Sequence, residues 1–310
     1  MSVLIFADYD DGKLKPATAR LVGAAKQLGA DIDILVAGDN VGDVAKQAAK
    51  LAGVNRVLLA NDAGLKNRTA EVLCDILVDI IKPYSHFFIA SNSLGKNLLG
   101  RLAAKLDLMP ISDVIKIHSR NKFDRPIYAG NAIKTLSTDQ DKILASIRVS
   151  AFDPVVQNND AKIEQIEVGK INALVEVLNE KRNKNDMVDL SSAAIVVAGG
   201  QAFESKENFA MLYQLGEVLG AAVGATRAAV DLGFAPNEMQ IGQSGKIIAP
   251  ELYIAVGISG ALQHLAGISG AKKIIAINSD ADAPMMKFAD IALVGDLKII
   301  LPELIKKLAS

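Results

Sequence analysis

A short glycine-rich run, Gly257-Ile258-Ser259-Gly260, combines the residue types that best suit contact with a phosphate group. It follows an apolar stretch typical of a strand, residues 252–256, and precedes a helical pattern that carries Gln263 and His264. Glycine lets the backbone turn tightly and approach a ligand, and the free amides at a helix N-terminus attract anions. The run therefore predicts a dinucleotide phosphate site. The alternative is that its glycines serve only a tight turn between strand and helix.

Three better-known motifs are approached in this sequence but not completed. Ser259 lies in a run that lacks the last glycine of a hydrolase nucleophile elbow, because position 261 is Ala. Residues 242–246 resemble a P-loop, but Gln240 stands where the first glycine belongs and Ile247 replaces the magnesium-binding Ser or Thr. No Gly-x-Gly-x-x-Gly follows the first predicted strand of either half. Ester hydrolysis, hydrolysis of nucleoside triphosphates and the ordinary nicotinamide site are therefore unsupported.

Charged and ionisable side chains near these segments have both functional and structural interpretations. Arg227 follows a turn of small residues and could bind a phosphate or stabilise a developing anion, with a surface salt bridge as the alternative. His264 could donate a hydrogen bond to an anionic ring, with a structural histidine as the alternative. Asp231, Asp280 and Asp282 are expected to cap helices or to lie solvated in loops.

The composition disfavours several classes of protein and site. The 34 Lys and Arg residues nearly balance the 35 Asp and Glu residues, so the charge gives no reason to expect nucleic acid or an anionic membrane surface. Cys74 is the one cysteine and is expected in the core, which excludes an internal disulfide and fits a reducing compartment. The three histidines are scattered, which disfavours a metal site. No apolar run reaches the ~18 residues of a spanning helix, and we expect no signal peptide.

The first half of the chain alternates short apolar runs with helical patterns, which is typical of a parallel sheet covered by helices. We predict strands at residues 3–7, 32–37, 56–60 and 86–90, and helices at residues 16–28, 41–51 and 69–81. From about residue 110 the pattern changes, because strand-like runs at 114–117, 127–129 and 143–147 follow one another without helices. We expect these runs to form an antiparallel edge.

The second half restarts the alternation after a charged stretch, residues 180–189, which we interpret as a linker between domains. A helix that carries Phe209, Leu212, Leu215 and Leu219 is predicted to end at Gly220. Strands are predicted at residues 193–198, 221–223, 252–256, 273–277 and 291–294. The fold class is therefore α/β, with two three-layer αβα domains of mostly parallel sheets, the second flavodoxin-like and doubly wound. The domains are expected to span residues 1–189 and 190–310.

Ligands of open parallel sheets bind beyond the carboxyl ends of the strands, which directs attention to five loops. We expect these loops to meet at one edge of the sheet of the second domain, and we expect the first domain to be mainly an assembly surface. The loops are Gly199-Gly200-Gln201, Gly224-Ala225-Thr226-Arg227, Gly257-Ile258-Ser259-Gly260, Asn278-Ser279-Asp280 and Gly295-Asp296.

Three segments of the second domain carry a resemblance to a known family. They are residues 223–231 (VGATRAAVD), 240–246 (QIGQSGK) and 249–267 (APELYIAVGISGALQHLAG), followed by residues 276–278, 283–284 and 296–297. These segments resemble the signature of the electron-transfer flavoprotein alpha subunit. The resemblance implies one FAD held mainly by the second domain, a heterodimer with a beta subunit, and no substrate turnover by the chain itself. It also implies that electrons arrive from flavin dehydrogenases, such as acyl-CoA dehydrogenases, and leave to a membrane quinone reductase.

The resemblance also assigns residues to the cofactor. It implies that Arg227 lies over the flavin ring, that Ser244 approaches the N5 region, and that His264 approaches the N1 and C2 carbonyl region. The family commonly has Arg after the Gly-Gly pair, whereas this chain has Gln201, which can hydrogen-bond but cannot neutralise a diphosphate. The structural AMP of the family belongs to the beta subunit, so no residue here is assigned to it. The full set is Gln201, Thr226, Arg227, Ile241, Gly242, Gln243, Ser244, Ser259, Gly260, Ala261, Leu262, Gln263, His264, Asn278, Asp296 and Leu297.

Two other classes of function stay open. A nicotinamide-dependent enzyme would need a hydride acceptor and a substrate pocket with an acid or base, and the sequence shows no convergent residues for one. A cofactor-free interaction protein would keep the fold and bind no flavin. The start of the chain in a predicted strand favours the bacterial cytoplasm, although a mature mitochondrial form would look the same.

Overall fold

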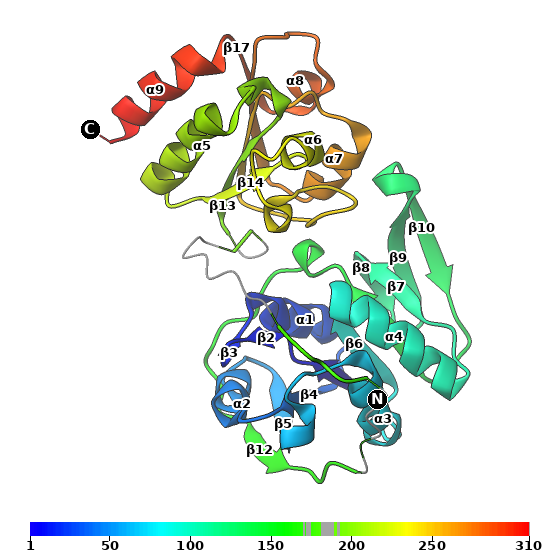
Figure 1. Ribbon diagram of the computed structural model, residues 1–310. Coiled ribbons are helices and arrows are strands. Elements are labelled where there is room, and N and C mark those ends of the chain that lie inside the picture. The colour runs from blue at the N-terminus through cyan, green and yellow to red at the C-terminus, as the bar shows by residue number, and fades with distance from the viewer. Residues whose placement is uncertain (170, 172–174, 181–188, 191–192, 310) are drawn as a thin grey trace. The chain divides into compact units, whose positions relative to one another are not determined.

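The computed structural model describes residues 1–169, 171, 175–180, 189–190 and 193–309, and it divides into two compact units. The main division between the two units falls within residues 181–188, which lie outside the described residues. Most of the predicted linker falls there, so the domain boundary at 189/190 stays a prediction. Each unit is an α/β layer structure of its own, which confirms the fold class (Figure 1).

The first unit is built on a seven-stranded sheet in which every neighbouring pair of strands is parallel. The strands predicted at residues 3–7, 32–37, 56–60 and 86–90 are confirmed as part of it. A short hairpin of β2 (Tyr9–Asp10) and β3 (Lys13–Leu14) was not predicted. In spatial order the sheet consists of β12 (Lys162–Gln165), β5 (Val54–Asn61), β4 (Asp31–Gly38), β1 (Ser2–Phe6), β6 (His86–Ala90), β11 (Ile143–Ile147) and β7 (Ile111–Val114).

Helices cover both faces of this sheet. Successive residues of its central strand, β1, point to opposite faces and therefore join two different cores. Val3 and Ile5 of β1 join one core with α1 (Pro16–Lys26) and α2 (Gly42–Ala49). Leu4 and Phe6 join a second core with α3 (Ala70–Ile80) and α4 (Ser93–Leu106). Cys74 of α3 is buried in this second core, as expected. The first half is therefore a three-layer structure.

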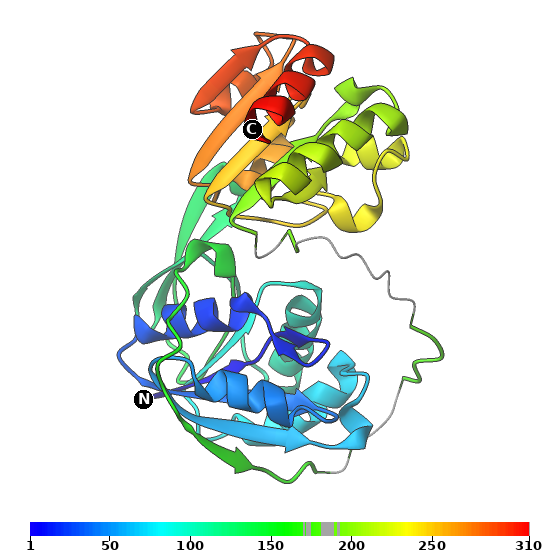
Figure 2. The same ribbon diagram turned by 90° about the vertical axis from the view of Figure 1, so that its left-hand side faces the viewer.

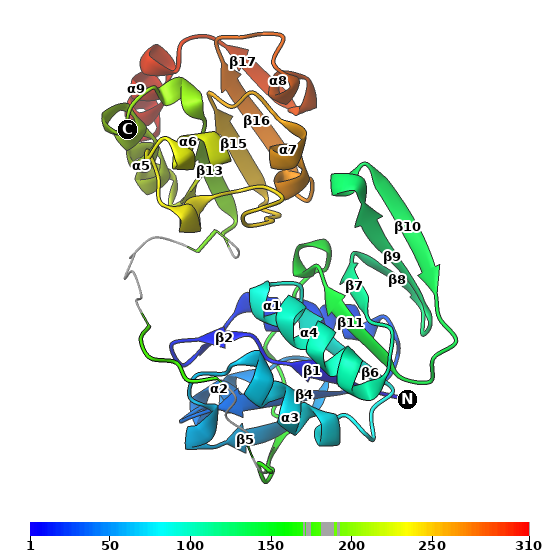
Figure 3. The same cartoon turned by 45° about the vertical axis from the view of Figure 1, so that its right-hand side comes forward.

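The region after residue 110 differs from the prediction. Its antiparallel strands form a separate sheet, in the order β10 (Ala132–Ser137), β9 (Lys122–Ile127) and β8 (Lys116–Ser119), rather than an edge of the main sheet (Figure 3). The strand predicted at 114–117 spans the end of β7 and the start of β8. The strand predicted at 127–129 is wrong, because residues 128–130 form a 3-10 turn in which Tyr128 has a φ of +50°.

The run at residues 143–147 has the predicted bounds but a different environment. This strand, β11, lies parallel to both β6 and β7, and all five of its residues are buried. Burial on both faces is typical of a strand inside a parallel sheet and not of an antiparallel edge. Helix α4, which was not predicted, leads from β6 to β7, and Asn92 Oδ1 caps it by accepting a 2.9 Å hydrogen bond from the amide of Gly95.

The second unit contains a five-stranded parallel sheet (Figure 2). Numbered along the chain, its strands lie in the order 2-1-3-4-5, which is the flavodoxin-like arrangement and confirms the expected fold. This order reverses direction between the first and third strands, so it creates a crevice at their carboxyl ends. In spatial order the strands are β14 (Ala222–Ala225), β13 (Ile195–Gly199), β15 (Leu252–Val256), β16 (Lys273–Asn278) and β17 (Ile291–Val294).

The helices of the second unit complete its layers. Helix α5 begins where Ser205 Oγ accepts a hydrogen bond from the amide of Asn208, and it ends at Gly220, whose φ is +58°. The apolar face predicted for it is buried at Phe209, Leu212 and Leu215. Helices α5 and α9 pack side by side. The helices are α5 (Lys206–Leu219), α6 (Arg227–Asp231), α7 (Leu262–Ile268), α8 (Pro284–Phe288) and α9 (Leu297–Leu308).

Short 3-10 helices and one edge strand complete the description. The 3-10 helices are η1 (Ala63–Leu65), η2 (Tyr128–Gly130), η3 (Val149–Ala151), η4 (Gln201–Phe203) and η5 (Asn237–Met239). All four residues of β17, the last strand of the second sheet, are exposed. In the part of the chain that is described, no helix combines the length and the apolar character needed to cross a membrane.

Candidate functional site

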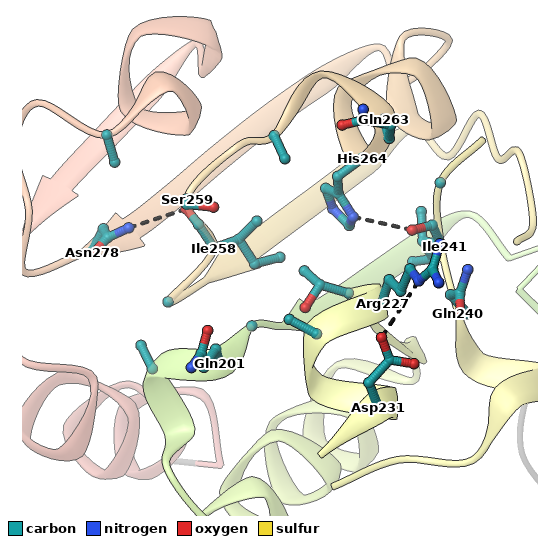
Figure 4. A pocket seen from close by; sticks show the side chains of 18 of the residues that line it. Gln201, Arg227, Asp231, Gln240, Ile241, Ile258, Ser259, Gln263, His264 and Asn278 are labelled. Atoms are coloured by element: carbon teal, nitrogen blue, oxygen red, sulfur yellow. Dashed lines mark hydrogen bonds and ion pairs between the residues drawn. The ribbon is translucent and has the colours of Figure 1, made fainter. Parts of the chain in front are cut away.

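A cavity of about 710 Å³ opens at the carboxyl ends of the strands of the second unit (Figure 4). Its volume lies in the range of ordinary small-molecule sites. Four of the five predicted loops meet there, whereas Gly295-Asp296 is not among the lining residues. The lining residues are Gly200, Gln201, Ala202, Thr226, Arg227, Ala228, Asp231, Gln240, Ile241, Gly242, Gln243, Ser244, Gly257, Ile258, Ser259, Ala261, Gln263, His264, Asn278, Asp280 and Ala283.

Two glycines allow the ends of β13 and β15 to come together at the crevice. A Cβ on Gly200 would overlap the carbonyl oxygen of Gly257, so only glycine fits there. Gly257 has a φ of +61°, in the left-handed region that favours glycine. The amide of Gly200 donates a 3.0 Å hydrogen bond to the carbonyl oxygen of Val256, and Asn278 Nδ2 donates one of 3.0 Å to that of Ile258 (Figure 4). Hydrogen bonds within the protein thus hold this turn in place.

Residues 240–246, which we call the return loop, form another wall of the cavity. The amide of Gln243 donates a 2.8 Å hydrogen bond to the carbonyl oxygen of Gln263 in α7. Gly242 has a φ of +143° and lies against the same carbonyl group. The hydroxyl of Ser244 accepts a 2.9 Å hydrogen bond from Gln240 Nε2. Within residues 237–256, all of them described, a 3-10 turn precedes the loop and β15 follows it, so the strand-loop-helix architecture of a P-loop is absent.

Arg227 forms the surface salt bridge that was its structural alternative, and it also lines the cavity, so its binding of an anion stays a prediction. It is the first residue of α6, which Thr226 Oγ1 caps by accepting a 3.3 Å hydrogen bond from the amide of Ala229. Its side chain is 72% exposed, lines the cavity, and places Nε 3.4 Å from Asp231 Oδ2 (Figure 4). Exposed ion pairs of this kind contribute little free energy. The guanidinium can therefore leave Asp231 for an anionic ligand at small cost.

His264 lines the cavity but is almost completely buried, at 6% exposure. Its Nδ1 lies 3.1 Å from the carbonyl oxygen of Ile241, and its Nε2 lies 2.7 Å from the hydroxyl of Tyr253. Burial lowers the pKa of this imidazole to about 4, against a smaller opposing effect of the Ile241 carbonyl group. Both nitrogens thus have protein partners. Donation of a hydrogen bond to a ligand ring, as expected from the sequence, would require one of these bonds to open, and it stays a prediction.

Four residues of the predicted set do not line the cavity. Asp296 Oδ1 accepts a 2.8 Å hydrogen bond from the amide of Lys298 and so caps α9, and Leu297 is buried in the same turn. Leu262 is 46% exposed at the start of α7. Gly260 has a φ of +87° and shapes the turn after β15. Contact of these four residues with a cofactor stays a prediction.

The cavity also contains charged and polar residues that were not assigned to a cofactor. Asp231 ends α6, and Gln240 directly follows η5. Both lie in the segments that carry the family resemblance, but neither directly follows a strand. The expectation that ligands bind beyond the carboxyl ends of parallel strands therefore does not select them. Asp280 is a loop carboxylate, as expected, and its Oδ1 accepts a 2.9 Å hydrogen bond from the amide of Asp282. The described residues hold no cluster of three or more side chains suited to a metal ion.

Comparison with known families decides what kind of protein carries this cavity. Residues 3–174 match the family model described as the electron transfer flavoprotein domain, and residues 189–269 match the model described as the electron transfer flavoprotein FAD-binding domain. The chain belongs to the electron transfer flavoprotein alpha-subunit family. The second match contains the ends of β13, β14 and β15, the return loop and α7, which together form most of the cavity.

Relatives of this alpha-subunit chain resemble it over most or all of their length. The electron transfer flavoprotein subunit alpha of Pseudomonas aeruginosa is 45% identical over 99% of this chain and 99% of its own. That of Paracoccus denitrificans is 44% identical over 99% of this chain and 100% of its own. The Caenorhabditis elegans protein named probable electron transfer flavoprotein subunit alpha, mitochondrial, is 44% identical over 98% of this chain and 92% of its own.

The residues of the cavity fit a flavin nucleotide. Ile241 and Ile258 provide buried apolar surface, and the glycine-lined turn after β13 gives close access to backbone groups. Gln201, Gln263 and Ser259 provide exposed amide and hydroxyl groups that suit sugar hydroxyls and phosphates. Arg227 is the arginine of the lining, and Gln201 adds a neutral amide to it. The site therefore offers hydrogen-bonding groups and one guanidinium to a bound nucleotide.

Proposed function

We propose that this alpha subunit joins a beta subunit in a heterodimer that holds one FAD and carries electrons without turning over a substrate of its own. Flavin dehydrogenases, acyl-CoA dehydrogenases among them, donate the electrons, and a membrane quinone reductase accepts them. The compartment proposed is the bacterial cytoplasm. The mitochondrial matrix is the alternative, because relatives of the chain include proteins named mitochondrial.

The observation that carries this proposal is the position of the cavity in the flavodoxin-like sheet. The cavity lies at the carboxyl ends of the neighbouring strands β13 and β15, where the strand order reverses, and this is the position at which such sheets bind a flavin nucleotide. The matched FAD-binding domain covers that same region of the chain. Of the ionisable side chains that line the cavity, His264 is buried and engaged by Tyr253 and Ile241, and Asp231 is paired with Arg227.

The residues of the chain bind and tune, while bound FAD supplies the redox chemistry. Arg227 presents a positively charged guanidinium, so it stabilises negative charge placed against the wall of the cavity. Ser244 accepts a hydrogen bond from Gln240 and keeps its own O–H for an acceptor atom in the cavity. Gln201 replaces a charge by a neutral amide, so we expect weaker retention of the diphosphate than in a chain with Arg there.

Copurification with the beta subunit tests the cofactor. We expect a yellow stoichiometric complex with flavin absorption bands, and we expect chromatography of the released cofactor to show FAD rather than FMN. A complex that stays colourless after incubation with excess FAD would refute the flavin site and would favour a cofactor-free interaction protein. Gln201→Arg is the matched variant, and it should lower the dissociation constant of FAD.

A second experiment tests the proposed electron donors. The coloured complex is mixed anaerobically with purified flavin dehydrogenases, each with its own substrate, and bleaching of the flavin bands is recorded. We expect bleaching only when both dehydrogenase and substrate are present. Direct consumption of a substrate by the complex alone, with a nicotinamide as oxidant, would instead identify an enzyme.

A further inference from the structure

A chain of hydrogen bonds links three elements of the second unit behind the wall of the cavity. The hydroxyl of Tyr253 in β15 lies 2.7 Å from Nε2 of His264 in α7. Nδ1 of the same imidazole lies 3.1 Å from the carbonyl oxygen of Ile241 in the return loop. Tyr253 is fully buried, and Ile241 and His264 are nearly so. A short hydrogen-bonded path thus runs from the central strand of the sheet to the return loop. Figure 4 shows its second step, from His264 to Ile241.

The chemistry of these partners fixes the position of each proton. A carbonyl oxygen only accepts, so Nδ1 of His264 carries a hydrogen and donates it to Ile241. A neutral imidazole with a proton on Nδ1 has a lone pair on Nε2, and the Tyr253 hydroxyl is the donor that faces it. Burial raises the pKa of the Tyr253 phenol, which keeps this donor protonated. Burial lowers the pKa of His264 to about 4, so the ring is neutral near pH 7.

We propose that Tyr253 is a positioning residue that holds His264 as a neutral imidazole protonated at Nδ1, and thereby anchors the return loop beside the flavin site. This inference deepens the proposed function and rests on it for the identity of the ligand. His264 then forms part of the cavity wall as an uncharged side chain and holds the return loop through Ile241. The fixed positive charge of the site is then that of Arg227, and the proton count of the site does not change with His264 between about pH 5 and 8.

The charged groups near the His264 imidazole are paired with one another or exposed to solvent, so they do not favour its protonated form. Arg227 and Asp231 of α6 pair with each other at 3.4 Å. Lys246, at the end of the return loop, pairs with Asp189 at 3.3 Å. Asp280 follows β16 and is exposed. From β15 and from α7 itself, Tyr253 is the only other titratable side chain, because the sequence of α7 is Leu-Gln-His-Leu-Ala-Gly-Ile.

Nitrogen NMR on the complex with the beta subunit tests the protonation state directly. Labelling with ¹⁵N-histidine marks three rings in this chain, His86, His118 and His264, and His264→Asn identifies the third. With an unlabelled beta subunit, we expect the His264 ring to show a protonated Nδ1 and a hydrogen-bonded, unprotonated Nε2 from pH 5.5 to 8.5. A ring that titrates within this range, or one protonated at Nε2 alone, would overturn the inference.

The variant Tyr253→Phe tests the positioning role, and Tyr213→Phe is its matched control. The Tyr213 hydroxyl lies 3.5 Å from the sulfur of Met239, and Tyr213 is not among the residues that line the cavity. In Tyr253→Phe we expect the Nε2 resonance to move downfield, toward that of an imidazole nitrogen without a hydrogen bond. We also expect faster solvent exchange of the Nδ1 proton and a roughly fivefold higher dissociation constant for the flavin. The control should match the wild type in all three.

The outcomes separate this inference from the proposed function. Spectra are recorded with the flavin bound and after its removal, so a complex that binds no flavin refutes the proposed function while the NMR result still decides the role of Tyr253. Identical Nε2 resonances in wild type and Tyr253→Phe would refute the positioning role even if the flavin binds. Circular dichroism of both variants verifies that the second unit is folded.

Discussion

The carbonyl oxygen of Gly257 occupies the position that a Cβ on Gly200 would take. These two residues directly follow the neighbouring parallel strands β13 and β15, and both line the cavity where the strand order reverses. A side chain at this point would have to push the two strand ends apart or displace the turn after β15. The geometry of the cavity therefore depends on a glycine that itself contributes no chemical group.

Gly200→Ala should reduce both stability and flavin retention. Overpacking of a tight site typically costs about 1 to 3 kcal/mol, and here the displaced atoms belong to the cavity wall. Thermal unfolding and the flavin absorbance per mole of complex measure the two effects. Gly100→Ala in α4 is the control, because nothing lies within 4 Å of the added methyl group. Equal flavin content in both variants would contradict the importance of the Gly200 contact.

Arg227→Ala should make the reduction potential of the bound flavin more negative. Removal of a fixed positive charge destabilises the more negative, reduced cofactor, and a tenfold change in a one-electron equilibrium corresponds to about 60 mV. A spectroelectrochemical titration measures the shift. Asp231→Asn is the companion variant: it removes the partner of Arg227 at 3.4 Å and keeps the guanidinium, so its potential should stay the same or rise. An unchanged potential in Arg227→Ala would remove Arg227 from the cofactor site.

The stability of the second unit should fall in mild acid because of His264. The folded state lowers the pKa of this imidazole from 6.5 to about 4, so below pH 6.5 the unfolded chain takes up a proton that the folded chain does not. The contribution of His264 to the free energy of unfolding is thus fully present above pH 6.5. It is lost toward pH 4 and amounts to about 3 kcal/mol at most. Urea unfolding of wild type and His264→Asn over this range isolates the effect. Parallel pH curves for the two proteins would contradict it.

Asp33→Ala should destabilise the first unit strongly. Asp33 is 4% exposed and accepts hydrogen bonds from Tyr84 Oη at 2.6 Å, Arg56 Nε at 2.8 Å and Asn55 Nδ2 at 3.1 Å. Loss of the carboxylate leaves the buried phenol without its acceptor, for which we expect a cost of about 2 to 4 kcal/mol.

The matched control for Asp33 is an ion pair at the surface. Asp43 and Lys46 approach to 2.8 Å with both side chains largely exposed, so Asp43→Ala should leave the midpoint of urea unfolding unchanged. Similar midpoints for Asp33→Ala and Asp43→Ala would show that the buried network contributes no more than a surface pair.

The sequence predicted most strands of both sheets because their residues are buried on both faces and therefore form continuous apolar runs. It did not reveal α4, whose fourteen residues include Gly95 and Gly100, which lower the helical propensity of the segment. Gly95 is there for a tertiary reason, since a Cβ at this position would overlap the carbonyl oxygen of Ala90. Tyr128 was misread as part of a strand because its positive φ leaves no mark in the residue type.

The site was predictable where its residues follow the ends of strands. Gln201, Thr226, Ser259 and Asn278 line the cavity as expected, because the topology brings those four loops to one place. Gln240 could not be found in this way, because a 3-10 turn and a return loop bring it to the wall. The hydrogen-bond partners of His264 could not be predicted from the sequence either. Tyr253 and Ile241 lie in apolar runs, and their polar atoms meet the imidazole only in the folded unit.

The edge strand β17 bears on how the protein must be handled. Its four residues are exposed, and three of them, Ile291, Leu293 and Val294, carry large apolar side chains. An exposed edge strand of this kind can pair with a strand of a second chain, and natural proteins usually prevent this with charged residues or proline at the edge. We therefore expect the chain produced alone at high concentration to self-associate, and we expect Leu293→Lys to reduce that self-association.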